Sequence, residues 1–167
     1  MRYPERMYRE GCRLAIVPRL RTDPRSLDPR AKTGNYLNNM LGLIEARRAG
    51  ADDALFLNAE GNLTESTTAN AWIVEEGRIF TPPLEEGLLE GITRSWIFSR
   101  LPAAGIPVAE ATIDEARLRR AEEVFLSGTV KGIMPVASID GRAVGAGRPG
   151  PVSLRAGALY AEALAGN

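Results

Sequence analysis

The residues of this chain that could carry out covalent chemistry are few. Nineteen of its 21 basic residues are arginines, histidine does not occur, and Cys12 is the single cysteine. Arginine stays protonated at ordinary pH, so it serves neither as a nucleophile nor as a proton carrier. Lys32 and Lys131 are the only lysines, and a lysine amine can condense with a carbonyl group when its surroundings keep part of it unprotonated. Any covalent chemistry is therefore expected at a lysine.

Lys32 is the first candidate because of its position. It follows the turn-forming pair Asp28 and Pro29 and precedes a helical pattern, a junction at which a side chain can point into a cleft. An ordinary solvated lysine at the start of a helix is the alternative interpretation. Lys131 lies beside Thr129 and could bind a substrate carboxylate, but a surface lysine on a turn is the interpretation that we favour.

Two polar stretches could supply further functional groups. Residues 64–70 form a polar run between two apolar strands, in which the carboxylate of Glu65 could face a cleft. Residues 127–130, just past a buried strand, offer hydroxyl and N–H groups for a phosphate or a carboxylate. Taken alone, the first stretch is typical of a connector and the second of a turn.

A glycine at the start of a helix is the third feature. Residues 89–94 place Gly91 where the first N–H groups of a helix have no partner within the helix, and such groups bind phosphate readily. The hydroxyl of Thr93 could add a contact. An ordinary glycine cap is the alternative interpretation, because a short glycine motif is weak evidence by itself.

The elements that position these residues follow from hydrophobic periodicity and turn signals. Strands are expected at residues 12–17, 54–57, 63–65, 70–75, 78–81, 107–111, 123–126, 135–139 and 142–144. Helices are expected at residues 35–49, 91–100 and 152–164, and from Thr112 or Asp114 to Arg120. Residues 18–31 contain three prolines and are expected to form a long loop. Because hairpins and crossover helices are mixed, the fold class is α/β with a mixed sheet.

Length and composition indicate one globular domain. The 167 residues carry 21 basic and 21 acidic side chains, so charge does not favour a nucleic-acid partner. No apolar run is long enough to cross a bilayer, and the N-terminus lacks the apolar core of a signal peptide. A single cysteine fits a reducing compartment, so a cytoplasmic location is expected. No metal site is expected.

Taken together, the order and spacing of these residues resemble the class IV aminotransferases. These are the fold-type IV pyridoxal-phosphate enzymes, which include branched-chain and D-amino-acid aminotransferases and aminodeoxychorismate lyase. The resemblance covers roughly residues 30–165 and implies a mixed, barrel-like sheet with flanking helices. It rests on the motifs Lys32-x-x-Asn35-Tyr36-Leu37, Glu65 with Asn70, Gly91-Ile92-Thr93-Arg94, Ser127-Gly128-Thr129 and Pro135-Val136.

The resemblance implies pyridoxal 5'-phosphate as cofactor and a role for each matching residue. Lys32 would bond covalently to the cofactor aldehyde. Glu65 would pair with the pyridine nitrogen and keep it protonated, so that the ring can accept electrons. Tyr36 would form a hydrogen bond near the ring hydroxyl group.

The phosphate group of the cofactor is assigned by the same resemblance to the helix start. Ile92 and Thr93, following Gly91, would hold it through N–H groups and a hydroxyl, with Thr129 as a further phosphate or carboxylate contact. The family usually has proline where this chain has Glu90, a departure that bears on loop rigidity rather than on a catalytic group.

A larger departure lies at the front of the chain. Family members carry an N-terminal α/β domain that supplies an arginine to the phosphate and much of the substrate pocket. Residues 1–30 are expected to be the interdomain connector and arm, and residues 31–167 the cofactor-binding C-terminal domain. The chain is thus expected to be the cofactor-binding half of such an enzyme, a fragment or the product of a truncated reading frame, and to bind cofactor weakly.

The function implied is amino-group transfer between an amino acid and a 2-oxo acid, in a homodimer. One alternative is 4-amino-4-deoxychorismate lyase, which releases pyruvate and uses the same lysine. The glycine- and proline-rich tail at residues 147–152 favours the transaminase. A second alternative is a non-catalytic fragment that folds but binds cofactor weakly.

Overall fold

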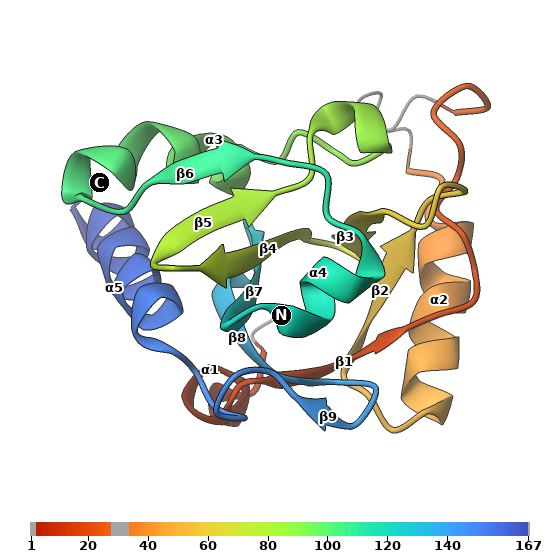
Figure 1. The fold of residues 1–167 in the computed structure, drawn as a ribbon, viewed down its shortest axis with the longest axis horizontal. Helices are drawn as coiled ribbons and strands as arrows, with labels where there is room; N and C mark the ends of the chain where they lie inside the picture. The colour runs from red at the N-terminus through yellow and green to blue at the C-terminus, as the bar shows by residue number, and fades with distance from the viewer. Residues whose placement is uncertain (1–2, 28–33, 167) are drawn as a thin grey trace.

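The structure, a computed structural model, describes residues 3–27 and 34–166 (Figure 1). Within them one mixed sheet contains parallel and antiparallel pairs. Its strands are β1 (Cys12–Ile16), β2 (Asp53–Leu57), β3 (Leu63–Ser66), β4 (Asn70–Glu75), β5 (Arg78–Thr81), β6 (Val108–Glu110), β7 (Glu123–Gly128), β8 (Gly132–Ile139) and β9 (Arg142–Ala143). The helices are α1 (Glu5–Glu10), α2 (Leu37–Arg48), α3 (Ile92–Arg100), α4 (Glu115–Arg120) and α5 (Pro151–Ala165), with short 3-10 turns at Leu84–Glu86 and Pro102–Ala104.

The sheet closes on itself. Its strand order is β3-β2-β1-β8-β7-β4, and β3 also pairs with β4, so that six strands form a ring within the described residues. Strands β5 and β6 continue the sheet outward from β4, while β9 pairs with β8. Helices α2 and α5 lie on opposite sides of the ring (Figure 1). The expected mixed, barrel-like sheet with flanking helices is confirmed.

Strand β4 shows why the ring strands are apolar on both faces. Ala71 and Ile73 belong to a buried cluster with members from all six ring strands, which therefore fills the ring. Trp72 and Val74, on the opposite face, belong to a second cluster that includes side chains of α3 and α5. Successive side chains of a strand point to opposite faces, and here both faces are covered. A third cluster packs Phe56 of β2 under α2.

The structure departs from the expectations mainly at the N-terminus. Residues 5–10, expected within a connector or arm, form α1, which buries Met7. The following strand, β1, was expected, and it pairs with both β2 and β8 inside the ring. Of the two caps considered for α4, the structure uses Asp114, whose side chain accepts the N–H of Arg117. None of the helices in residues 3–27 and 34–166 is long and apolar enough to cross a membrane.

Candidate functional site

A cavity of about 480 Å³ opens at the end of the ring where two turns meet. One is the β3–β4 turn, residues 67–69, and the other is the β7–β8 turn, residues 129–131. The start of α2, the loop that includes Arg21, and the residues that lead into α3 complete the wall. Most of the polar stretches singled out in the sequence therefore converge on one space.

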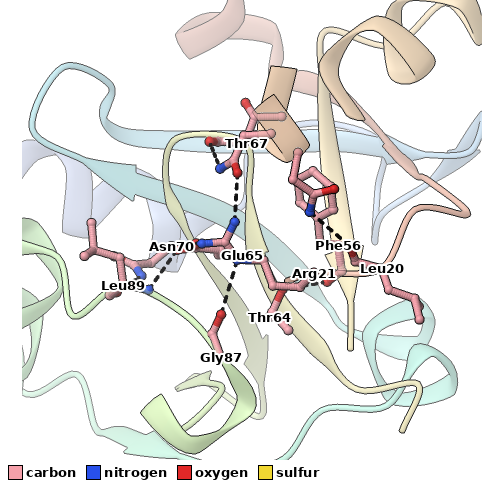
Figure 2. Close-up of polar contacts among 11 residues, drawn as sticks. Leu20, Arg21, Phe56, Thr64, Glu65, Thr67, Asn70, Gly87 and Leu89 are labelled. Carbon is pink, nitrogen blue, oxygen red and sulfur yellow. Dashed lines mark hydrogen bonds and ion pairs between the residues drawn. The ribbon is translucent and has the colours of Figure 1, made fainter. Parts of the chain in front are cut away.

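Glu65 presents the carboxylate of this cavity. It stands near the end of β3, opposite Asn70 of β4, and is only 5% exposed. One carboxylate oxygen lies 2.7 Å from the guanidinium group of Arg21, and the other accepts the N–H of Leu89 at 3.2 Å (Figure 2). Burial raises the pKa of Glu65 to about 7, while the positive charge of Arg21 and the N–H of Leu89 act in the opposite direction.

Arg21 is a site residue that the sequence reasoning missed. Its side chain is 12% exposed and reaches from the loop after β1 into the cavity wall. Besides Glu65, it donates to the carbonyl oxygen of Gly87 at 3.2 Å (Figure 2). It also donates to the side-chain oxygen of Asn39 at 2.8 Å. Arg21 thus ties the loop to β3, to α2 and to the segment before α3. The one sequence signal that could have pointed to it is the length of its loop.

The N-terminus of α3 is held beside Glu65 by two hydrogen bonds to Leu89. Glu65 accepts its N–H, and the side-chain amide of Asn70 donates to its carbonyl oxygen at 2.7 Å. Gly91 follows with a φ of 34°, and a Cβ there would lie 2.2 Å from the side-chain oxygen of Asn70. The helix has no side-chain cap, so its first N–H groups are available to an anion. Ile92 is 81% exposed and lines the cavity.

Of the other predicted cofactor-binding residues, two line the cavity and one has its side chain buried elsewhere. Tyr36 and Thr129 are exposed and line the cavity. Thr93 is fully buried, and its hydroxyl oxygen lies 3.2 Å from that of Tyr160 on α5, away from the residues that line the cavity. The contact expected between the Thr93 hydroxyl and the phosphate stays a prediction, and the backbone N–H of Thr93 lies at the helix start.

Lys32 lies outside the described residues. Leu27 and Gly34, which are described on either side of it in the sequence, both line the cavity. Its assignment as the reactive lysine stays a prediction.

Lys131 is not the surface lysine that we favoured, and this interpretation is wrong. Its side chain is 3% exposed, because the turn presents Thr129 and Val130 outward and then returns into the end of the ring. The ammonium group lies 2.5 Å from a carboxylate oxygen of Asp53 and donates to the hydroxyl of Thr68 at 2.9 Å. A buried charge requires such partners, and Asp53 at the start of β2 provides the opposite charge.

Comparison with known proteins agrees with the fold and identifies the family. The family described as amino-transferase class IV matches residues 1–139. The branched-chain-amino-acid aminotransferase of Escherichia coli strain K12 is 41% identical over 136 residues, which are 81% of this chain and 44% of that protein. The probable branched-chain-amino-acid aminotransferase of Aquifex aeolicus is 35% identical over 159 residues, which are 94% of this chain and 51% of that protein.

Solved structures of such enzymes superpose closely on the chain. The branched-chain aminotransferase from Thermobaculum terrenum, in its pyridoxal-phosphate form, has a TM-score of 0.90 at 35% identity, covering 98% of this chain and 54% of that one. The enzyme from Thermoproteus uzoniensis with norvaline has a TM-score of 0.91 at 38% identity, covering 98% and 55%. The chain spans about half the length of the relatives that it matches. It belongs to the class IV aminotransferase family.

Proposed function

We propose that this chain carries the pyridoxal-phosphate site of an aminotransferase, which exchanges an amino group between an amino acid and a 2-oxo acid. The observation that carries the proposal is Glu65: a buried carboxylate, fixed by Arg21 and by the N–H of Leu89, on the wall of a cavity of about 480 Å³. Related structures contain pyridoxamine 5'-phosphate or are in a pyridoxal-phosphate form.

The residues present fit this cofactor in the chemistry of their donors and acceptors. A pyridine nitrogen requires an acidic partner, and Glu65 has two oxygens with acceptor capacity beyond the bonds they already make. A phosphate requires N–H donors, and α3 begins at the cavity without a side-chain cap. Tyr36 and Thr129 offer hydroxyl groups from the wall. When bound, the cofactor supplies an electron sink for the carbon that loses its proton.

Each of these residues then has a defined task. Glu65 would hold a proton at the pyridine nitrogen of a bound cofactor, and its pKa of about 7 would let it share that proton near neutral pH. Arg21 orients the Glu65 carboxylate through its own bonds to Gly87 and Asn39. Lys32 would supply the amine for the cofactor aldehyde and would carry the proton of the substrate.

We further propose branched-chain amino acids as substrates, because the similar proteins carry that name at 35–41% identity. A homodimer is supported by the outer side of α2, where Leu37, Met40 and Ile44 are 66%, 50% and 43% exposed at helical spacing. A cytoplasmic location is supported by the single cysteine, Cys12, which is free.

The test is covalent labelling. The chain is mixed with pyridoxal 5'-phosphate, reduced with borohydride and digested, and the modified lysine is identified by mass spectrometry. We expect the label on Lys32 and an absorption band that borohydride removes. Lys32→Ala should abolish that band, whereas Lys131→Ala, the matched control, should leave it.

A band that survives Lys32→Ala would contradict the assignment of the reactive lysine. Amino-group transfer from leucine, valine or isoleucine to a 2-oxo acid is then measured on the unreduced chain with cofactor added. Glu65→Gln keeps the shape of the side chain and removes its charge, so turnover should fall steeply while cofactor remains bound. Unchanged turnover in that variant would contradict the role of Glu65.

A further inference from the structure

A lysine among the described residues that line the cavity has no part in the proposed reaction. Lys131 lines the same space as Glu65 and Tyr36. The chain therefore has two lysine amines with which a bound aldehyde can react, Lys32 and Lys131. The reaction needs only one of them, so a physical reason must exist for Lys131 to stay unreactive.

The surroundings of Lys131 supply that reason. Its nitrogen lies 2.5 Å from Asp53 and 2.9 Å from the hydroxyl oxygen of Thr68, and 5.3 Å from the centre of the Tyr3 ring. All three neighbours favour a positively charged donor: a carboxylate, a hydroxyl oxygen and the face of an aromatic ring. An ammonium ion has no lone pair, and only the neutral amine attacks a carbonyl carbon.

Asp53 is itself fixed in position. Its other carboxylate oxygen accepts the hydroxyl of Thr67 at 2.5 Å and the N–H of Ala54 at 2.8 Å, and the residue is 4% exposed. A carboxylate held by these donors cannot rotate away from the lysine without breaking both hydrogen bonds. The ion pair is therefore built into β2 and the β3–β4 turn.

We infer that Asp53 determines which lysine reacts: its carboxylate holds Lys131 as an ammonium ion and so reserves a carbonyl ligand for Lys32. The inference deepens the proposed function and rests on it for the identity of the aldehyde. Without the charge of Asp53, the buried ammonium group would lack its counter-charge and would no longer be held in an ion pair. Once it has given up one proton to water, its nitrogen would bond to the aldehyde carbon, and the aldehyde oxygen would leave as water with the two remaining amine hydrogens.

The experiment compares the two lysines within one chain. Wild type, Asp53→Asn and Asp52→Asn are each treated with pyridoxal 5'-phosphate and borohydride, and the two lysine peptides are quantified by mass spectrometry. Asp52→Asn is the matched control, because it makes the same substitution at the neighbouring position, where the carboxylate pairs with Arg13 rather than with Lys131. A second arm uses formaldehyde and cyanoborohydride, which need no cofactor site.

We expect Lys131 to be labelled about tenfold or more strongly in Asp53→Asn than in wild type, because removing one partner of a buried ion pair leaves the other charge uncompensated. Asp52→Asn should stay near wild type. Equal labelling of Lys131 in wild type and Asp53→Asn, in both arms, would overturn the inference. Circular dichroism verifies that each variant is folded.

If Asp53→Asn does not fold, the test is made on wild type alone. Lys131 should be protected from formaldehyde in the native chain and labelled once guanidinium chloride unfolds it, and labelling of the native chain at the unfolded rate would overturn the inference. Failure of the proposed function has a different signature. In that case pyridoxal 5'-phosphate does not label Lys32, while labelling of Lys131 by formaldehyde still depends on Asp53.

Discussion

Replacing Glu65 with glutamine should remove a pH dependence of stability that the buried carboxyl group imposes. Burial raises the pKa of Glu65 from its ordinary value of 4.5 to about 7, against the lowering effect of Arg21. Between these two values the folded chain keeps the proton and the unfolded chain releases it. The stabilising contribution of this group is therefore fully present below about pH 4.5 and is lost as pH rises through about 7.

The size of the effect follows from the displacement of the pKa. At about 1.36 kcal/mol for each pH unit, moving from 4.5 to about 7 corresponds to about 3 kcal/mol. Most of this change falls between pH 5 and pH 8, because the unfolded chain is already largely ionised at pH 5. Glutamine cannot ionise, so its contribution to the free energy of unfolding is the same at both values.

Urea unfolding at pH 5 and pH 8 measures this difference, with the fluorescence of buried Trp72 as the signal. The free energy of unfolding of wild type should fall on going to pH 8 by about 2–3 kcal/mol more than that of Glu65→Gln. The contributions of other groups cancel in this comparison. Glu60→Gln, at an exposed position, is the control and should follow wild type. If wild type and Glu65→Gln lose the same free energy, the carboxyl group does not hold its proton in the way we describe.

Three further perturbations test other parts of the structure. Gly91→Ala places a Cβ 2.2 Å from the side-chain oxygen of Asn70. Urea unfolding should therefore show at least about 1 kcal/mol more destabilisation for this variant than for the control Gly77→Ala, where φ is also positive but no atom lies within 4 Å of the new Cβ. Equal losses in the two variants would argue against the collision. Glu123→Gln should lower the free energy of unfolding by about 1 kcal/mol, because the Glu123 carboxylate accepts the first N–H groups of α5 at 2.9 and 2.8 Å; an unchanged urea midpoint would contradict that capping role. Burial raises the pKa of Cys12 to about 12, so a thiol reagent should modify it only after unfolding, and rapid modification of the native chain would be inconsistent with its buried position.

The parts of the fold that could be predicted depend on local signals. The hairpin at residues 70–75 and 78–81 agrees with β4 and β5 residue for residue. Its turn, Glu76-Gly77, has φ values of 50° and 72°, as expected for a short connection between antiparallel strands. The Asp140-Gly141 turn behaves in the same way. In both cases the apolar runs and the turn residues lie within a few positions of each other, so spacing alone suffices.

The parts that could not be predicted depend on partners far apart in sequence. Arg21 is one of nineteen arginines, and nothing near it marks it as the partner of Glu65. Lys131 meets Asp53 across 78 positions, so its burial follows from closure of the ring rather than from the turn on which it lies. Thr93 lies in the first turn of α3 as expected, but the packing of α5 decides where its hydroxyl points.

The two ion pairs of the cavity are connected by hydrogen bonds. Thr67 donates its hydroxyl to Asp53 and accepts the side-chain amide of Asn39 at its carbonyl oxygen, at 2.5 and 2.6 Å. Asn39 in turn accepts a hydrogen bond from Arg21 at 2.8 Å, and Arg21 holds Glu65. Through these bonds, one polar network positions both the Lys131 amine, which is proposed to stay unreactive, and the Glu65 carboxylate, which is proposed to share a proton with the ring nitrogen.

This network also determines where an anion can be held. Among the described residues that line the cavity, the cationic side chains are Arg21 and Lys131, and a carboxylate already neutralises each of them. An incoming phosphate therefore gains little from either without disrupting an ion pair. The N–H groups at the start of α3 carry no such counter-charge, and Glu65 and Asn70 hold Leu89 so that these groups stay at the cavity. The phosphate of a ligand is consequently expected at the N-terminus of α3. Glu65, whose carboxylate is proposed to pair with the ring nitrogen, also holds this end of α3 in position.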